Sequence, residues 1–258
     1  TAGDHFVLNP EQKEFTLSAE DDTVSVVYEG VTYKNERQKI QISVEKKNSV
    51  TKEALEGVVF GLYAGEDIKN MQGKVVVEKD TLLETKATDQ EGRLTFESDL
   101  WHGHYYVKED QHLPGYLPND EIWEIDATYE DQNLPAILLE KEVENQPTES
   151  YFTKTDIVTG EPVEGAKLQI LDEEGTVVRE WITTKEEHLE YALPAGNYIL
   201  HEELPPLEDG YVSAEDVSFE VKEDGTITKV EMKDDFSKVD ISKTDITGDT
   251  ELVGVKLQ

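Results

Sequence analysis

The chain contains no cysteine among its 258 residues. Disulfide bonds therefore cannot brace it, which is typical of a reducing compartment and equally compatible with a secreted protein that uses another covalent brace. The sequence also has no apolar run near the roughly 20 residues that a membrane-spanning helix requires, and it shows no signal peptide. These absences exclude a disulfide scaffold and predict no direct membrane insertion.

Basic residues are scarce. The 24 lysines and arginines face 58 aspartates and glutamates, which gives a formal net charge of −34. Such a chain repels phosphate polymers, so neither nucleic acid nor an anionic lipid surface is expected as a partner. The charge is typical of a soluble protein whose neighbouring modules repel one another.

No segment carries an apolar stripe with the period of an amphipathic helix over ten or more residues. Alternating or β-branched segments recur instead, including VSVVYEGVTY at 24–33, KIQISV at 39–44, HYYVKE at 104–109 and VSFEV at 217–221. Turn sequences such as DEEG, KEDG and LPAG separate these segments. Short strands at intervals of about 8–12 residues predict all-β sandwiches.

One pattern occurs three times, each time with a lysine eleven residues before a glycine. The three pairs are Lys46 with Gly57, Lys154 with Gly165, and Lys243 with Gly254. An internal repeat of this length indicates tandem modules, each large enough to bury its own core.

Two further patterns accompany the lysines. Asn145 and Asp234 each lie nine residues before a repeat lysine, and the motif GxYxxxE occurs twice, ending at Glu109 and at Glu202. A lysine, a carboxamide or carboxyl group, and a glutamate are the parts that an internal amide crosslink needs. Burial would favour the neutral amine that attacks and the protonated glutamate that assists.

The repeat predicts the module boundaries. Val31, Tyr33 and Asn35 share one strand face, as Val143 and Asn145 do, so the start of the chain resembles the end of a module. The short connectors favour a semi-rigid, elongated rod. The expected divisions are 1–37 as the C-terminal part of a preceding module, 38–147 and 148–236 as complete modules, and 237–258 as the N-terminal part of a following one.

These motifs resemble the SpaA/CnaB-type domains of Gram-positive pilins and surface adhesins. The resemblance rests on KTDxxTGxxxxGAKLQI, on GxYxxxE followed by GY, and on a closing strand that ends in Asn or Asp, and it covers nearly the whole chain. It implies tandem Ig-like (CnaB/prealbumin-like) β-sandwich modules, in which a lysine of the first strand joins an Asn or Asp of the last strand with the help of a glutamate.

The resemblance implies a specific pairing for each module. Carried over by motif, the groups are Lys46 with Asn145 and Glu109, Lys154 with Asp234 and Glu202, and two half-sites, Asn35 and Lys243, whose partners lie outside this sequence.

The first module departs from the pattern at its lysine. It reads KKN where the other copies read KTD, so Lys47 is a rival nucleophile, although the spacing to Gly57 and the alternation with Val44 favour Lys46. No YPKN-like motif is present, which in family pilins supplies the lysine for polymerisation. A stalk or adhesin segment therefore fits better than a polymerising subunit.

Other candidate sites have weaker support. His102, His104 and His112 lack the carboxylate spacing of a zinc site, and Trp123 and Trp181 are expected to pack on the sandwich core rather than to form a sugar platform. No EF-hand loop and no distinct carboxylate pair for glycoside hydrolysis is evident. No metal, no cofactor and no enzymatic activity on an external substrate is expected.

The sequence therefore predicts a structural stalk segment on the cell-wall-associated, extracellular surface of a Gram-positive bacterium. Its main partners would be neighbouring modules of the same chain. One alternative is an adhesin module that binds a host protein or glycan, and another is a spacer without crosslinks in a large extracellular enzyme.

Overall fold

The computed structural model describes residues 5–12, 18–20, 23–25, 34–70, 72–207, 210–237, 243 and 247–248. Within these ranges the regular structure consists of β-strands, and no α-helix is present. The chain divides after Pro147 into two compact units, Thr1–Pro147 (unit 1) and Thr148–Gln258 (unit 2).

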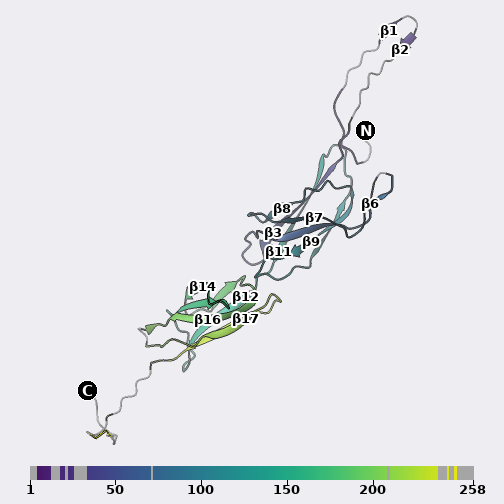
Figure 1. Cartoon of the computed structure of the whole chain (residues 1–258). Coiled ribbons are helices and arrows are strands. Elements are labelled where there is room, and N and C mark those ends of the chain that lie inside the picture. The colour runs from purple at the N-terminus through teal and green to yellow at the C-terminus, as the bar shows by residue number, and fades with distance from the viewer. Residues whose placement is uncertain are drawn as a thin grey trace. The chain divides into compact units, whose positions relative to one another are not determined.

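Unit 1 is a β-sandwich of a four-stranded and a three-stranded sheet (Figure 1). The first sheet has the order β10-β9-β4-β7, with β10 (Ile122–Ala127), β9 (Gly103–Gln111), β4 (Val59–Ala64) and β7 (Leu82–Ala87). The second has the order β11-β3-β8, with β11 (Ala136–Asn145), β3 (Lys39–Asn48) and β8 (Arg93–Thr95). A small two-stranded sheet pairs β5 (Ile68–Lys69) with β6 (Val75–Val77).

The alternation of β3 explains why it forms an inner strand of the sandwich. Ile40, Ile42 and Val44 are buried, whereas the residues between them are more exposed. Because successive side chains of a strand point to opposite faces, one face enters the core and the other meets water. The inward residues pack against Phe60, Leu62, Tyr105 and Val107 of the opposite sheet within one cluster.

Unit 2 repeats the plan with different strands. Its four-stranded sheet has the order β14-β13-β16-β17, with β14 (Val177–Ile182), β13 (Lys167–Leu171), β16 (Gly196–Leu204) and β17 (Val217–Val221). Its three-stranded sheet has the order β15-β12-β18, with β15 (His188–Tyr191), β12 (Glu149–Asp156) and β18 (Thr228–Asp234). The core includes Phe152, Leu168, Ile170, Leu200 and Met232.

Each unit is closed by a parallel pair that joins its first and last long strands. In unit 1 β11 runs parallel to β3, and in unit 2 β18 runs parallel to β12. Parallel neighbours cannot be joined by a tight hairpin, so the chain between them builds the remaining strands of the sandwich. The two ends of a module therefore lie on adjacent strands.

The described residues before β3 include a short antiparallel hairpin of β1 (Ser18–Glu20) and β2 (Thr23–Ser25). Residues 5–8 attach to unit 1: the Val7 N–H donates to the Glu36 carbonyl at 2.8 Å, and the Leu8 N–H to the Gln132 carbonyl at 2.7 Å. The expected strand face with Val31 and Tyr33 lies outside the described residues.

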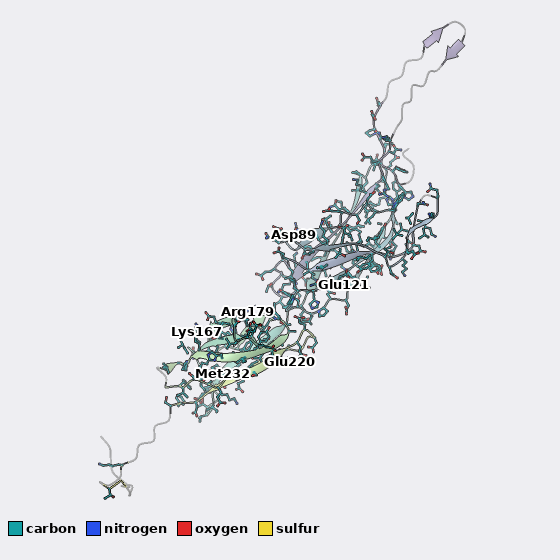
Figure 2. All side chains as sticks on the ribbon, in the orientation of Figure 1. Asp89, Glu121, Lys167, Arg179, Glu220 and Met232 are labelled. Carbon is teal, nitrogen blue, oxygen red and sulfur yellow. The ribbon has the colours of Figure 1, made fainter. Side chains whose placement is uncertain are left out.

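Charged side chains project from both units, as Figure 2 shows for Asp89, Glu121, Arg179 and Glu220, while Met232 is fully buried in unit 2. No helix in the part of the chain that the structure describes has the length and apolarity that crossing a bilayer requires.

Candidate functional site

Unit 1 buries Lys46, Glu109 and Asn145 together at one end of the sandwich. The Lys46 amine donates to Asn145 Oδ1 at 2.5 Å and lies 2.9 Å from Glu109 Oε2. Asn145 Nδ2 in turn donates to Glu109 Oε1 at 2.8 Å. Lys46 has no exposed surface, and the Glu109 side chain is 3% exposed. The carboxyl group of Glu109 therefore touches both the amine and the amide nitrogen.

The strand register explains this contact. Val143 is the cross-strand partner of Lys46, and Asn48 is the partner of Asn145. Asn145 thus lies two residues beyond the position opposite Lys46, and an offset of two keeps both side chains on the inner face. Glu109 comes from β9 of the other sheet and reaches across the core.

Unit 2 builds the same arrangement with Lys154, Glu202 and Asp234. The Lys154 amine lies 3.0 Å from Glu202 Oε1 and also contacts Asp234 Oδ1. All three side chains are at most 1% exposed. The register repeats as well, because Met232 is opposite Lys154 and Asp156 is opposite Asp234.

Burial shifts the ionisation of one group in each unit, Lys46 in unit 1 and Asp234 in unit 2, toward its neutral form. Desolvation lowers the pKa of the Lys46 amine, against the opposing hydrogen bond and charge of Glu109. Desolvation also raises the pKa of Asp234, and Glu202 adds to this effect while Lys154 opposes it. A less basic amine is a better nucleophile at neutral pH, and a protonated carboxyl can lose water.

The unit 2 triad is close in distance but poor in hydrogen-bond geometry. Lys154 Nζ, Glu202 Oε1 and both carboxylate oxygens of Asp234 are buried within the described part of the chain without a hydrogen bond of acceptable geometry. Their ion-pair distances are nevertheless short. Buried charges that are not fully hydrogen-bonded are costly, so this arrangement favours any reaction that removes them.

A small cavity adjoins the unit 2 triad. It has a volume of about 90 Å³ and is lined by Lys154 together with Phe152, Trp181, Thr183 and His188, among others. This is enough space for water molecules beside the lysine.

The tyrosine of each GxYxxxE motif anchors the strand that carries the glutamate. Tyr105 OH donates to the Trp101 carbonyl at 2.5 Å, and Tyr198 OH to the Pro194 carbonyl at 3.0 Å. The glutamate follows four residues later, so it points to the same inner face as the tyrosine.

The glycine of the lysine–glycine repeat has a backbone role. Gly57 and Gly165 have φ values of 86° and 82°, a region that L side chains rarely adopt. Their N–H groups donate to the carbonyls of Thr88 and Thr183, at 2.9 and 3.0 Å. Gly254 lies outside the described residues.

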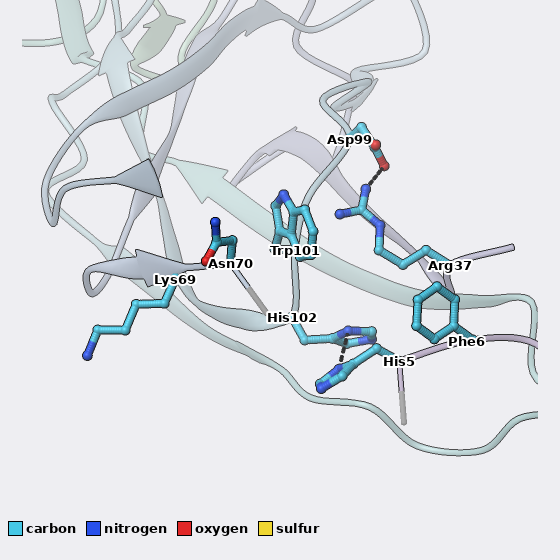
Figure 3. Close-up of a pocket in the computed structure, with 8 residues that line it drawn as sticks. All are labelled: His5, Phe6, Arg37, Lys69, Asn70, Asp99, Trp101 and His102. Carbon is cyan, nitrogen blue, oxygen red and sulfur yellow. Dashed lines mark hydrogen bonds and ion pairs between the residues drawn. The ribbon is translucent and has the colours of Figure 1, made fainter. Parts of the chain in front are cut away.

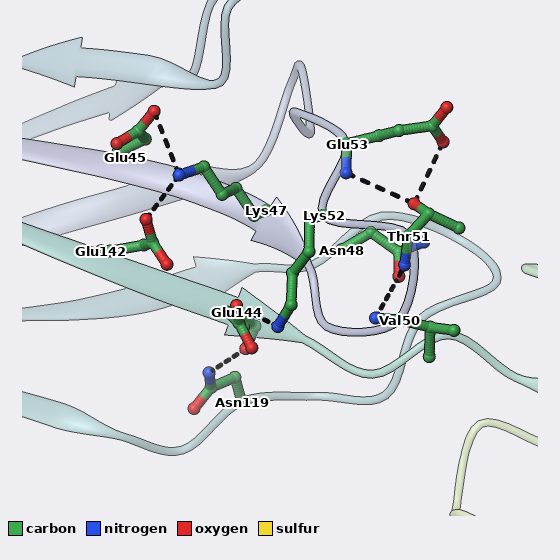
Figure 4. Close-up of polar contacts among 10 residues, drawn as sticks. All are labelled: Glu45, Lys47, Asn48, Val50, Thr51, Lys52, Glu53, Asn119, Glu142 and Glu144. Atoms are coloured by element: carbon green, nitrogen blue, oxygen red, sulfur yellow. Dashed lines mark hydrogen bonds and ion pairs between the residues drawn. The ribbon is translucent and has the colours of Figure 1, made fainter.

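Sequence reasoning missed the residue two positions after each lysine. Asn48 is buried, and its Oδ1 accepts from the N–H groups of Val50 and Thr51 at 2.8 and 3.1 Å (Figure 4). Its Nδ2 donates to Tyr116 OH at 3.2 Å. The chain turn beyond β3 is thereby fixed directly beside Asn145. Two sequence features could have indicated this contact: the third residue of KKN and KTD, which is Asn or Asp, and the tyrosine of the GY motif.

Asp156 plays the corresponding role in unit 2. Its Oδ1 accepts from the N–H groups of Val158 and Thr159, at 2.8 and 2.6 Å. The Thr159 backbone bond first, then the Val158 backbone bond and the hydroxyls of Thr159 and Tyr211, hold the pKa of Asp156 below its ordinary value, although desolvation opposes them.

The rival lysine points away from the core. Lys47 Nζ lies 2.5 Å from Glu142 Oε2 and 3.4 Å from Glu45 Oε1, and its side chain is 25% exposed (Figure 4). The structure therefore brings Lys46, and not Lys47, into contact with Asn145 and Glu109.

The two half-sites are not part of either triad. Asn35, before β3, and Lys243, after β18, are both exposed. Neither of them lies on a named strand of the described chain.

The remaining sequence candidates have other contacts. His102 Nε2 lies 3.2 Å from Gln38 Oε1, while His104 contacts Asp126 and Glu124 at 2.7 Å each. Among the described residues no group of three or more His, Asp or Glu side chains is arranged to hold a metal ion. Trp123 and Trp181 pack against the cores of units 1 and 2, as expected.

Comparisons with solved structures give likenesses to several pilins and to one other bacterial protein. The Bacillus anthracis TIE protein is 26% identical over 79% of this chain, with a TM-score of 0.46, and this chain spans only 35% of that protein. The shaft pilin SpaA of Lactobacillus rhamnosus GG is 16% identical, over 78% of this chain and 99% of its own, with a TM-score of 0.40. A minor pilin of Streptococcus agalactiae is 13% identical, over 79% and 99%, with a TM-score of 0.34.

No curated protein sequence matches the chain significantly. The family assignment comes from a sequence model, that of the SpaA prealbumin-like fold domain, which matches twice, at residues 40–140 and 149–235. These two matches include more than two thirds of the chain and correspond to the two sandwiches. The chain therefore belongs to the SpaA prealbumin-like domain family.

Proposed function

We propose that each unit forms an intramolecular isopeptide bond, Lys46 to Asn145 in unit 1 and Lys154 to Asp234 in unit 2, and that the chain is a covalently braced stalk segment. The observation that carries this proposal is the buried contact of all three groups in both units, with the same strand offset. A simple buried ion pair would not explain why the same strand offset occurs in both units. It would also not explain why unit 1 has a carboxamide, Asn145, where unit 2 has the carboxyl group of Asp234.

In unit 1 the neutral Lys46 amine attacks Cγ of Asn145, which is one bond from the oxygen it contacts. The new bond joins Lys46 Nζ to Asn145 Cγ, and the bond from Cγ to Nδ2 breaks. Glu109 touches both nitrogens, so it can accept the proton that the amine loses and supply one to the departing nitrogen. The amide nitrogen leaves as ammonia, and the atoms balance without a cofactor.

In unit 2 the same attack on the protonated Asp234 carboxyl releases water. Glu202 is held in place because its Oε2 accepts from the Ala214 N–H at 2.7 Å, while its Oε1 lies beside the lysine. The cavity next to Lys154 can receive the water that leaves.

Two physical effects drive both reactions. Groups held in contact avoid the cost of a bimolecular encounter, which can be worth about 7–11 kcal/mol. Amide formation also replaces a buried amine and its partner by one neutral group, which removes the cost of keeping charges away from water. Each reaction happens once per molecule, so the chain modifies itself and turns over no external substrate.

The position of the bonds suits a load-bearing role. The unit 1 bond links the end of β3 to the end of β11 and encloses a loop with a sequence separation of 99 residues. Tension along the chain would pass from one strand to the other through covalent bonds and bypass the rest of the sandwich. On a loop-entropy estimate such a link also stabilises the fold by about 4–5 kcal/mol.

Family membership supports a stalk role in a Gram-positive pilin or adhesin, and with it a cell-surface location. We place complete modules at 38–147 and 148–236, parts of adjoining modules at 1–37 and 237–258, and the half-sites Asn35 and Lys243 in those parts. The division of the chain after Pro147 supports the central boundary. Neighbouring modules are then the principal partners.

The intact mass of the denatured protein tests the crosslinks. Two bonds predict a deficit of one ammonia and one water, about 35 Da in all. A deficit of about 17 Da would mean that unit 1 alone had reacted. A mass equal to that of the uncrosslinked sequence would overturn the proposal.

A further inference from the structure

A pocket of about 400 Å³ lies in unit 1 around Trp101. We call it the Trp101 pocket, and Figure 3 shows its lining. The lining residues are His5, Phe6, Arg37, Lys69, Asn70, Asp99, Trp101 and His102. Its volume is at the lower end of the range for small-molecule sites and suits a ligand the size of a monosaccharide.

The charge of the lining contrasts with that of the chain. Acidic residues outnumber basic ones by more than two to one in the sequence, yet Arg37 and Lys69 face a single acid, Asp99, in this pocket. Two histidines add further capacity for positive charge. A local excess of positive charge in an anionic protein favours a small anionic ligand over a cationic one.

Trp101 supplies an apolar surface beside these cations. The Arg37 guanidinium lies 4.4 Å from the centre of the indole and pairs with Asp99, yet Trp101 remains 36% exposed. In Figure 3, Arg37 and Asp99 lie on one side of the indole and Lys69 and Asn70 on the other. A planar aromatic surface next to fixed donors suits the C–H face of a sugar ring.

The remaining polar groups of the pocket are held in place. Asn70 Oδ1 accepts from the N–H groups of Gln72 and Lys74, both at 3.0 Å, so its Nδ2 group is the one that can donate to a ligand. His102 Nδ1 lies 3.0 Å from His5 Nδ1, and its Nε2 lies 3.2 Å from Gln38. These bonds fix the donors before a ligand arrives, which reduces the entropy cost of binding.

We propose that the Trp101 pocket binds an acidic monosaccharide unit, with the sugar ring against Trp101 and its carboxylate on Arg37, while Lys69 adds positive charge from the other side of the indole. Arg37 offers a planar pair of donors that matches a carboxylate, and the exposed Asp99 side chain can yield its place to the ligand. This binding goes beyond the stalk role and gives unit 1 a recognition site of its own.

The pocket is separate from the crosslink. Arg37 and Gln38 precede β3, whereas Lys46 lies near its other end, about 30 Å away along an extended strand. The Lys46→Ala variant should therefore still bind the sugar. A missing mass deficit would contradict the crosslinks, whereas missing sugar binding would contradict only the Trp101 pocket proposal.

The direct test follows the three tryptophan indole N–H signals by NMR while the full chain is titrated with D-glucuronate, N-acetylneuraminate, D-glucose or acetate. The Trp101 signal, assigned with Trp101→Phe, should shift with at least one acidic sugar at roughly 10 mM, where a ligand with a Kd of about 1 mM is nearly saturating. The Trp123 and Trp181 signals should not shift. Glucose and acetate, each of which lacks one half of the recognised chemistry, should bind at least about tenfold more weakly.

Variants identify the residues. Arg37→Gln and Lys69→Gln should each weaken binding by about tenfold, since each removes a positive charge from the pocket lining. Arg93→Gln is the matched control, because Arg93 pairs with Glu45 outside this pocket. If Arg37→Gln lowers the melting temperature of unit 1, Lys69→Gln, at an exposed side chain, decides the question.

Binding should also respond to pH. Desolvation and the charges of His5 and Arg37 lower the pKa of His102, which is also faced by Gln38 and Tyr129. A bound carboxylate favours protonated His102, so binding takes up protons and affinity should rise as the pH falls below about 6.5. An unmoved Trp101 signal with both acidic sugars, equal binding of glucose, or unchanged affinity in both pocket variants would each overturn the proposal.

Discussion

The amine of Lys46 contacts the side chain of Asn145 although Val143 is the residue opposite Lys46 on the neighbouring parallel strand. A shift of one residue would turn Asn145 toward solvent, whereas the shift of two keeps it inside. The same offset joins Lys154 to Asp234. The register of the closing strand pair is therefore the geometric basis of both triads.

Replacing Lys46 should affect unit 1 far more than replacing its neighbour. Lys46→Ala should restore about 17 Da, lower the melting temperature of unit 1 by roughly 20 °C through loss of the covalent loop, and leave unit 2 crosslinked. Lys47→Ala is the matched control, because Lys47 points outward and pairs with Glu142 and Glu45. Mass spectrometry and differential scanning calorimetry measure both effects. If Lys47→Ala lost the ammonia deficit, Lys47 rather than Lys46 would form the bond, and the proposed assignment would be wrong.

Removing either glutamate should stop or slow the reaction in its own unit. Glu109→Ala and Glu202→Ala each remove the group that moves the protons, and such groups contribute about 10²- to 10⁴-fold to a rate. Time-resolved intact mass after refolding should show about 17 Da restored in the first variant and about 18 Da in the second. Glu45→Ala, at a partly exposed glutamate on β3, should react normally. A full deficit in Glu109→Ala on the wild-type timescale would remove Glu109 from the mechanism.

Converting Asp234 to asparagine should change the leaving group of unit 2. Asp234→Asn should still crosslink, because Asn145 occupies the corresponding position in unit 1, but it should release ammonia instead of water. Peptide mapping of the Lys154 link should find the same amide product in the wild-type protein and in Asp234→Asn. Asp234→Ala, which has no carbonyl group to attack, should leave unit 2 with its full uncrosslinked mass.

The Asn48 side chain should stabilise the end of β3 without taking part in the reaction. Asn48→Ala removes the acceptor of two backbone N–H groups and should cost about 1–3 kcal/mol of unfolding free energy. The ammonia deficit should still develop, more slowly, because Asn145 is less firmly placed. Asn48→Asp, which keeps the acceptor as Asp156 does in unit 2, should recover most of the lost stability. Urea unfolding and timed mass spectra compare the two variants, and equal stability of both would contradict this role.

The buried amine should make uncrosslinked unit 1 more stable at higher pH. In Glu109→Ala the bond is absent and so is the main group that opposes the lowered Lys46 pKa, while desolvation remains. Between the lowered pKa of the folded state and about 10.4 in the unfolded state, unfolding takes up a proton. The free energy of unfolding should therefore rise with pH across this window. Urea titrations at pH 7, 8 and 9, followed by Trp101 and Trp123 fluorescence, measure the slope, and Lys46→Met in the same background should abolish it.

Much of the architecture was predictable because β-sandwich patterns are local. The alternation of 39–44 placed Ile40, Ile42 and Val44 on one face, and that face is buried. The eleven-residue spacing from lysine to glycine reflects a turn that requires a positive φ at Gly57 and Gly165. Local geometry of this kind depends on residues that are close together in the sequence, so the sequence alone predicts it.

The Trp101 pocket and the turn residues were not predictable in this way. Asn48 with Tyr116, and Arg37 with Trp101, are contacts between segments far apart in the chain. A local repeat motif does not predict which side chains from distant segments will contact it.

The sequence by itself determined the strand content and the repeat, because periodicity and spacing are properties of the chain alone. The resemblance to SpaA/CnaB-type domains then indicated which lysine, glutamate and Asn or Asp belong together. Only the tertiary structure decided that Lys46 is buried while Lys47 is outside, that the closing strands pair in parallel with an offset of two, and that Glu109 and Glu202 reach the triads from the opposite sheet. Those outcomes depend on the packing of two sheets against each other, and packing sets both the contact distances and the desolvation that lowers the Lys46 pKa and raises that of Asp234.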